Sequence, residues 1–154
     1  MTVFLVRHAK AGNRAEWERP DDTRPLSKKG QRQAEKMADV LAARGIERII
    51  SSPSLRCVQS VQPLADRLRL EVETSDALAE GVDADDVIDL FRSLRSTTAA
   101  LSTHGDVIPI LLDALVEQDG LELPEAYPCA KGSAWELEQD GSGRAVAAMY
   151  LPAP

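Results

Sequence analysis

The stretch that decides the fold is VFLVRHA, residues 3–9. Its apolar run leads directly into Arg7 and His8, a pattern typical of a buried strand that ends in polar side chains. The chain has one other histidine, His104, and it follows a similar run, TAALST, residues 98–103. Ligands of open α/β sheets bind at the carboxyl ends of the strands. The two imidazoles are therefore expected to share an anion site lined by arginine.

Strand and helix patterns alternate along the rest of the chain. Helices are expected to begin at Ser27, at Ser52 with Pro53 in the first turn, at Asp83 and near Val107. Strands are expected at residues 3–8, 46–51, 70–74 and 98–103, followed by a hairpin of 133–139 and 144–151. This order predicts a three-layer α/β/α fold with a mostly parallel sheet that ends in a β-hairpin. No boundary interrupts the pattern, so residues 1–154 are expected to form a single domain.

Charge is distributed unevenly along the sequence. The chain has a formal net charge of −7, yet residues 1–70 contain 14 Lys and Arg against 8 Asp and Glu. Residues 71–154 contain 4 against 17. A local positive potential in an acidic protein favours a small anion over a nucleic-acid polymer, which the acidic half repels.

Two further features indicate the compartment. Cys57 and Cys129 belong to no metal-binding or redox spacing, so both are interpreted as reduced thiols. The N-terminal apolar run has only the length of a strand, and no stretch is long enough to span a membrane. The expected location is the cytoplasm, with no membrane partner.

Arg56 is the third candidate for the anion site. It falls in the first turn of the helix expected after residues 46–51, close to the carboxyl end of that strand. An arginine fork donates two parallel hydrogen bonds to phosphate and keeps its charge, and a helix N-terminus adds backbone donors. An imidazole among such groups can act as a nucleophile, an acid, a base or a hydrogen-bond donor.

Four blocks of sequence resemble the histidine phosphatase superfamily, also called phosphoglycerate-mutase-like. They are LVRHA (5–9), LSKKGQRQA (26–34), SSPSLRCVQS (51–60) and THG (103–105). They occur in the family's order between residues 3 and about 108. The resemblance implies that His8 attacks phosphorus and is transiently phosphorylated, while Arg7, Arg56 and His104 hold the phosphoryl oxygens. It implies no metal and no organic cofactor.

The general acid is less clearly marked. The family usually supplies a carboxylate after a leucine in the segment that follows the third strand, and here that residue is Glu80, with Asp83 in reserve. Asp83 is also the expected helix cap. A carboxylic acid protonates a leaving group at neutral pH only when its pKa is raised. A surface position for Glu80 is the alternative interpretation.

Other positions are expected to contact substrate or to depart from the family pattern. Lys10 and Asn13 follow the nucleophile, and Gly105 follows the second histidine, so these three are the predicted substrate-binding residues. Position 9 is alanine where the family usually has glycine. Its carbonyl is expected to orient the other ring nitrogen of His8.

The short segment 76–96 leaves little room for the insertions of the larger family members. The chain is therefore similar to small phosphohistidine phosphatases of the SixA type, and protein phosphohistidine is the expected substrate. Nucleotides or other small phosphoesters are the alternative. A phospho-ligand binding module without turnover is a second class, and a metal-dependent hydrolase lacks the clustered carboxylates that it needs. The oligomeric state is left open.

Overall fold

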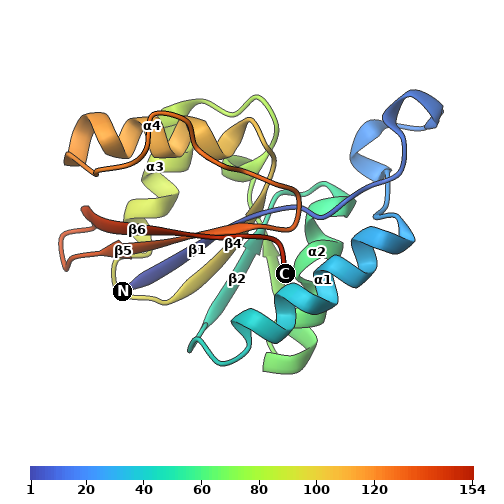
Figure 1. Cartoon of the computed structure of the whole chain (residues 1–154), viewed down its shortest axis with the longest axis horizontal. Coiled ribbons are helices and arrows are strands. Elements are labelled where there is room, and N and C mark those ends of the chain that lie inside the picture. Colours follow the sequence, from blue (N-terminus) through green and yellow to red (C-terminus); the bar gives the residue numbers. More distant parts are fainter.

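The computed structural model describes residues 1–154, and its centre is one six-stranded sheet (Figure 1). The strands are β1 (Thr2–Arg7), β2 (Arg48–Ser51), β3 (Val72–Thr74), β4 (Ala99–Thr103), β5 (Ala134–Gln139) and β6 (Ala145–Leu151). Their order across the sheet is β3-β2-β4-β1-β5-β6. The first four are parallel, and the β5–β6 hairpin joins antiparallel to β1. The predicted mostly parallel sheet with a terminal hairpin is confirmed.

Four helices cover the two faces of the sheet: α1 (Lys28–Leu41), α2 (Leu55–Leu68), α3 (Ala84–Ser93) and α4 (Val107–Asp119). Figure 1 shows α1 and α2 on one side of the strands and α3 and α4 on the other. Short 3-10 turns form at Arg14–Glu16, Asp21–Thr23 and Asp76–Leu78. No helix is both long enough and apolar enough to cross a membrane.

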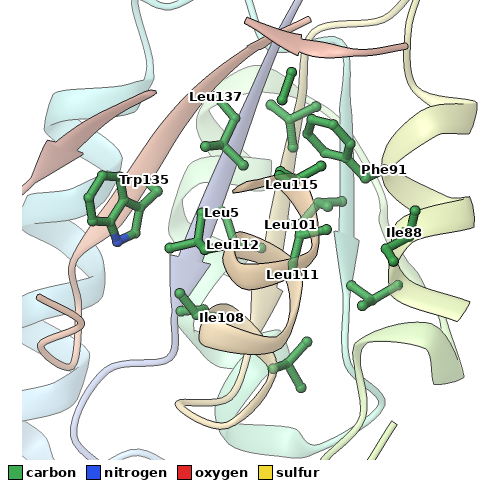
Figure 2. Close-up of a cluster of buried hydrophobic side chains, with 14 of the residues drawn as sticks. Leu5, Ile88, Phe91, Leu101, Ile108, Leu111, Leu112, Leu115, Trp135 and Leu137 are labelled. Carbon is green, nitrogen blue, oxygen red and sulfur yellow. The ribbon is translucent and has the colours of Figure 1, made fainter. Parts of the chain in front are cut away.

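The alternation of β1 divides the buried apolar side chains between the two layers. Val3 and Leu5 belong to the cluster under α3 and α4, and Phe4 and Val6 belong to the cluster under α1 and α2. Figure 2 shows the first cluster, in which Leu5 and the leucines of α4 interdigitate with side chains of β4 and β5. Successive side chains of a strand point to opposite faces, so a strand that is apolar on both faces must lie inside the sheet. β1 therefore fixes the position of His8 at the centre of the fold.

The expected cap at Ser52 is wrong. Helix α2 begins at Leu55 and its N-cap residue is Ser54, two positions later than predicted. The Ser52 hydroxyl is already engaged, because it lies 2.8 Å from Nε2 of His104. Asp83 does occupy the N-cap position of α3, but its side chain makes no capping hydrogen bond.

The start of α1 is pressed against the loop that follows His8. The Ser27 side chain caps the helix as predicted, accepting from the Gly30 amide at 3.1 Å. Ser27 also donates its own amide to the Lys10 carbonyl at 3.0 Å. A Cβ atom placed on Gly30 would lie 1.9 Å from the Lys10 carbonyl oxygen. Only glycine permits this approach, which fixes the backbone immediately after the nucleophile candidate.

We expect Gly30→Ala to lower the free energy of unfolding by about 2 kcal/mol, since backbone must move to admit the methyl group. Urea denaturation measures the difference. Gly141→Ala is the matched control, because nothing lies within 4 Å of a Cβ at that position, and it should change stability by less than about 0.5 kcal/mol. Equal stability of the two variants would show that α1 does not clamp the loop.

Candidate active site

Parallel pairing of β1 with β4 brings the two histidines together. Arg7 is in register with Thr103, and the His8 amide donates to the Thr103 carbonyl at 3.0 Å. The imidazole rings meet edge to face, with 5.5 Å between centroids. His8 is 7% exposed and His104 is 1% exposed. The predicted convergence at the carboxyl edge of the sheet is therefore what the structure has.

His8 presents a single ring nitrogen to the pocket. Its Nδ1 lies 2.7 Å from the Ala9 carbonyl, which can only accept, so Nδ1 carries the proton and Nε2 keeps a free lone pair. Burial lowers the pKa of His8 to about 4, and the charges of Arg56, His104 and Arg7 contribute, while the Ala9 carbonyl opposes the shift. The imidazole is consequently neutral and nucleophilic at pH 7.

Alanine at position 9 is fully compatible with this arrangement. Its carbonyl orients His8 as expected, and its amide donates to the Ser60 hydroxyl at 2.9 Å. Arg69 is the one non-glycine residue with a positive φ, so the turn after His8 does not require glycine. The Ser60 hydroxyl also donates to the Arg56 carbonyl at 2.6 Å, and its two hydrogen bonds join α2 to the loop that follows His8.

His104 is oriented by the residue that had been expected to cap α2. The Ser52 Oγ accepts from the Ser54 amide and lies 2.8 Å from His104 Nε2, and the Cys57 Sγ lies 3.5 Å from the same nitrogen. The His104 Nδ1 lies 3.5 Å from a Glu80 carboxylate oxygen, which accepts when Nδ1 carries the proton, and 3.4 Å from Arg56 Nη2, which donates when Nδ1 carries the lone pair. Burial, followed by the charge of Arg56, lowers the pKa of His104. A neutral His104 can thus donate a hydrogen bond into the site.

Arg56 is 1% exposed and lies beneath the pocket in the first turn of α2, as predicted. Its Nη2 contacts Glu80 at 3.0 Å and the Asp21 carboxylate at 3.1 Å, and its Nη1 donates to the Asp21 carbonyl at 2.9 Å. Burying a guanidinium requires such partners. These two carboxylates are acceptors of the kind that a phosphoryl group also offers.

Arg7 is the second arginine of the predicted anion site, and it lines the pocket next to His8. Its Nη1 donates to the Cys129 carbonyl at 2.5 Å, while its buried Nε has no partner. Gly105 makes room for this side chain, because a Cβ there would lie 2.8 Å from the Arg7 guanidinium. The role of Gly105 in the structure is thus to admit Arg7.

The raised pKa that an acid role requires of Glu80 is not found in this arrangement. Burial raises the pKa of Glu80, but the hydrogen bond from Arg14 and the charges of His104, Arg14 and Arg56 outweigh it and leave the pKa lowered. The side chain is 44% exposed, and Arg14 Nη2 lies 2.9 Å away. Glu80 is therefore ionised at neutral pH while it faces these cations.

Arg7, His8 and Glu80 line a pocket of about 1040 Å³. The predicted substrate-binding residues Lys10, Asn13 and Gly105 line it, although the side-chain oxygen Oδ1 of Asn13 already accepts from the Ala15 amide at 2.9 Å. Sequence patterns missed five contributors: Asp21, Arg24, Ser52, Ser60 and Asp106. Asp106 accepts from the Gly81 amide at 2.9 Å and holds the segment that carries Glu80. No group of three or more His, Cys, Asp or Glu side chains is arranged to hold a metal ion.

The fold and the pocket define an α/β protein with a paired-histidine, arginine-lined anion site. The chain belongs to the histidine phosphatase superfamily (branch 1), whose model matches residues 3–83.

Known proteins agree with this assignment. The 8-oxo-(d)GTP phosphatase of Mycolicibacterium smegmatis is 34% identical over 158 residues, covering 99% of this chain and 48% of the relative. The chain thus spans about half the length of that relative.

Solved structures match most of the fold. The protein histidine phosphatase SixA in complex with tungstate superimposes with a TM-score of 0.79 at 23% identity, covering 97% of this chain and 94% of SixA. A putative phosphohistidine phosphatase SixA from Agrobacterium tumefaciens gives 0.71 at 27% identity, covering 90% and 91%. The small, SixA-type branch predicted from the sequence is confirmed.

The hydrogen bonds of the two rings predict their protonation. We expect ¹⁵N NMR at neutral pH to find both histidines neutral, with the His8 proton on Nδ1, and His8 to titrate near pH 4. Ser52→Ala should change the ¹⁵N shifts of His104, which loses its 2.8 Å contact with the hydroxyl, and leave those of His8 as they are. Titration of His8 near its ordinary pKa of about 6.5, or a proton on its Nε2, would contradict the geometry.

Proposed function

We propose that this chain, residues 1–154 as one domain, is a metal-independent phosphatase that works through a phosphohistidine intermediate on His8. The observation that carries the proposal is the His8 ring itself. It is neutral, its Nδ1 is held by the Ala9 carbonyl at 2.7 Å, and Nε2 is free beside two arginines. A positioned, unprotonated imidazole is what nucleophilic attack on phosphorus requires.

The reaction has two steps. The Nε2 lone pair forms a bond to phosphorus as the bond to the leaving group breaks, and the leaving atom departs with its electron pair and takes up a proton. A water oxygen then attacks phosphorus, the P–N electron pair returns to Nε2, and inorganic phosphate is released as water loses a proton. Arg7, Arg56 and the Nδ1–H of His104 are positioned to offset the charge on the phosphoryl oxygens in both steps.

Glu80 is the candidate that supplies the proton to the leaving group. A phosphoryl group carries up to two negative charges and would compete with Glu80 for Arg56. The negative charge of the phosphoryl group and the loss of the Arg56 contact both raise the pKa of Glu80 from its lowered value in the structure. Asp83 is the weaker candidate, because it occupies the N-cap position of α3 and is not among the residues that line the pocket.

The substrate has two candidates. Protein phosphohistidine is supported by the likeness to SixA and by an open pocket that a protein surface can reach. A nucleotide or another small phosphoester is supported by the 34% identity with the 8-oxo-(d)GTP phosphatase. Both place a phosphoryl group on Nε2 of His8, so the chemical steps are shared.

The mechanism is tested by release of phosphate from p-nitrophenyl phosphate in the presence of a chelator. His8→Ala should reduce the rate more than about 1,000-fold, and His104→Ala by on the order of 10²–10³, because the first removes the nucleophile and the second a donor to the transition state. Thermal unfolding of each variant controls for folding. Activity that survives in His8→Ala, or that the chelator abolishes, would overturn the proposal.

The acid role of Glu80 is tested by comparing leaving groups. We expect Glu80→Gln to slow phenyl phosphate by at least about tenfold more than p-nitrophenyl phosphate, because phenolate, with a pKa of about 10, needs a proton more than nitrophenolate does. Glu125→Gln, in the loop before β5, is the matched control. Equal slowing of the two substrates would assign Glu80 to binding alone.

A further inference from the structure

We propose that Lys10 and Lys131 form a second anion subsite beside His8, which selects substrates that carry a second phosphate joined to the one transferred. The inference rests on the proposed function only in that His8, Arg7 and Arg56 receive the first phosphoryl group. It assigns a role to two cations that the proposed reaction leaves unused.

The pocket has more cations than one phosphoryl group engages. Arg14 is paired with Asp21 at 3.2 Å and with Glu80 at 2.9 Å, and Arg24 is paired with Asp21 at 3.1 Å. Lys10 and Lys131 also line the pocket, but neither makes an ion pair. They are the two ammonium groups of the site that have no carboxylate partner.

The backbone of each lysine is fixed close to the nucleophile. The Lys10 amide donates to Gln33 Oε1 at 2.9 Å, and its carbonyl accepts from the Ser27 amide and hydroxyl. Lys131 lies in the turn before β5, where the Gly132 amide donates to the carbonyls of Arg7 at 3.1 Å and His8 at 3.3 Å. The two side chains therefore start from anchored positions on separate segments, each within two residues of His8 or of its hydrogen-bond partner.

The positive charges around Lys131 favour the binding of a further anion. Burial lowers the pKa of Lys131, and repulsion from Arg7, Arg24, Lys10 and Arg14 lowers it further. A cation held among other cations is stabilised when a negative group binds between them. The carboxylates of this region, Asp21, Glu80 and Asp106, are already engaged by arginines or by the Gly81 amide.

The position of Lys10 and Lys131 beside His8 determines the class of ligand. A lone phosphomonoester is satisfied by Arg7, Arg56 and His104 and leaves the lysines without a partner. A second phosphate linked through a bridging oxygen places its charge next to the reacting phosphorus, on the open side where the lysines lie. The favoured substrate is therefore a terminal phosphoanhydride, as in a nucleoside diphosphate, rather than a phosphoryl group on a protein imidazole.

Binding of two non-hydrolysable probes tests the subsite without any turnover. We expect calorimetry at low salt to find that methylenediphosphonate binds the wild-type chain at least tenfold more tightly than methylphosphonate. The double variant Lys10→Met with Lys131→Met should reduce this ratio to about twofold or less. Lys36→Met, which removes an equivalent charge from an exposed position on α1, should leave the ratio unchanged. The preference of the wild-type chain for methylenediphosphonate should decrease as the salt concentration rises, because Lys10 and Lys131 are exposed.

Two results would overturn the inference: equal affinity of the wild type for the two probes, or a preference that survives in the double variant. Either result leaves the phosphohistidine mechanism untouched. Conversely, a chain that prefers the diphosphonate but never acquires a phosphoryl group has the subsite and lacks the proposed activity.

Discussion

The parallel pairing of β1 with β4 is the constraint on which the site depends. Because Arg7 lies in register with Thr103, β1 and β4 end side by side, and the next residue after each strand is a histidine. The pair of strands is apolar on both faces and sits between two helical layers, so neither strand can slip without exposing a core face. Catalytic geometry is thus set by the same packing that stabilises the fold.

Burial gives the two rings their chemistry. In water an imidazole is partly protonated near neutral pH, whereas the low exposure of His8 and His104, together with the arginines, favours the neutral form. The Ala9 carbonyl then holds the His8 proton on Nδ1, while Ser52, Arg56 and Glu80 contact the two ring nitrogens of His104. His8 is left with a lone pair on Nε2, so identical side chains stand in different hydrogen-bonding environments, which suits the two different roles proposed for them.

Local patterns predicted the strands and the helices, because periodicity is a property of short segments. Position at a strand end or a helix start also indicated that four side chains lie together, namely Arg7, His8, Arg56 and His104. They failed at Ser52, whose hydroxyl is taken by a histidine 52 residues away. They could not decide between the acid and the surface interpretation of Glu80, because its contact with Arg14 joins two loops that no spacing connects. Asp21 was missed for the same reason: a loop aspartate has no signature until folding brings buried Arg56 beneath it. Long-range contacts between loops therefore limit what the sequence alone predicts about the site.

In the proposed reaction, His8 carries the phosphoryl group during turnover. Intact-mass spectrometry after a brief pulse of p-nitrophenyl phosphate, stopped under alkaline conditions that preserve phosphohistidine, tests this directly. We expect a fraction of the wild-type chain to gain one phosphoryl group, located at His8 by peptide mapping and absent from His8→Ala. Phosphate release without any such species, or a phosphoryl group on another residue, would contradict it.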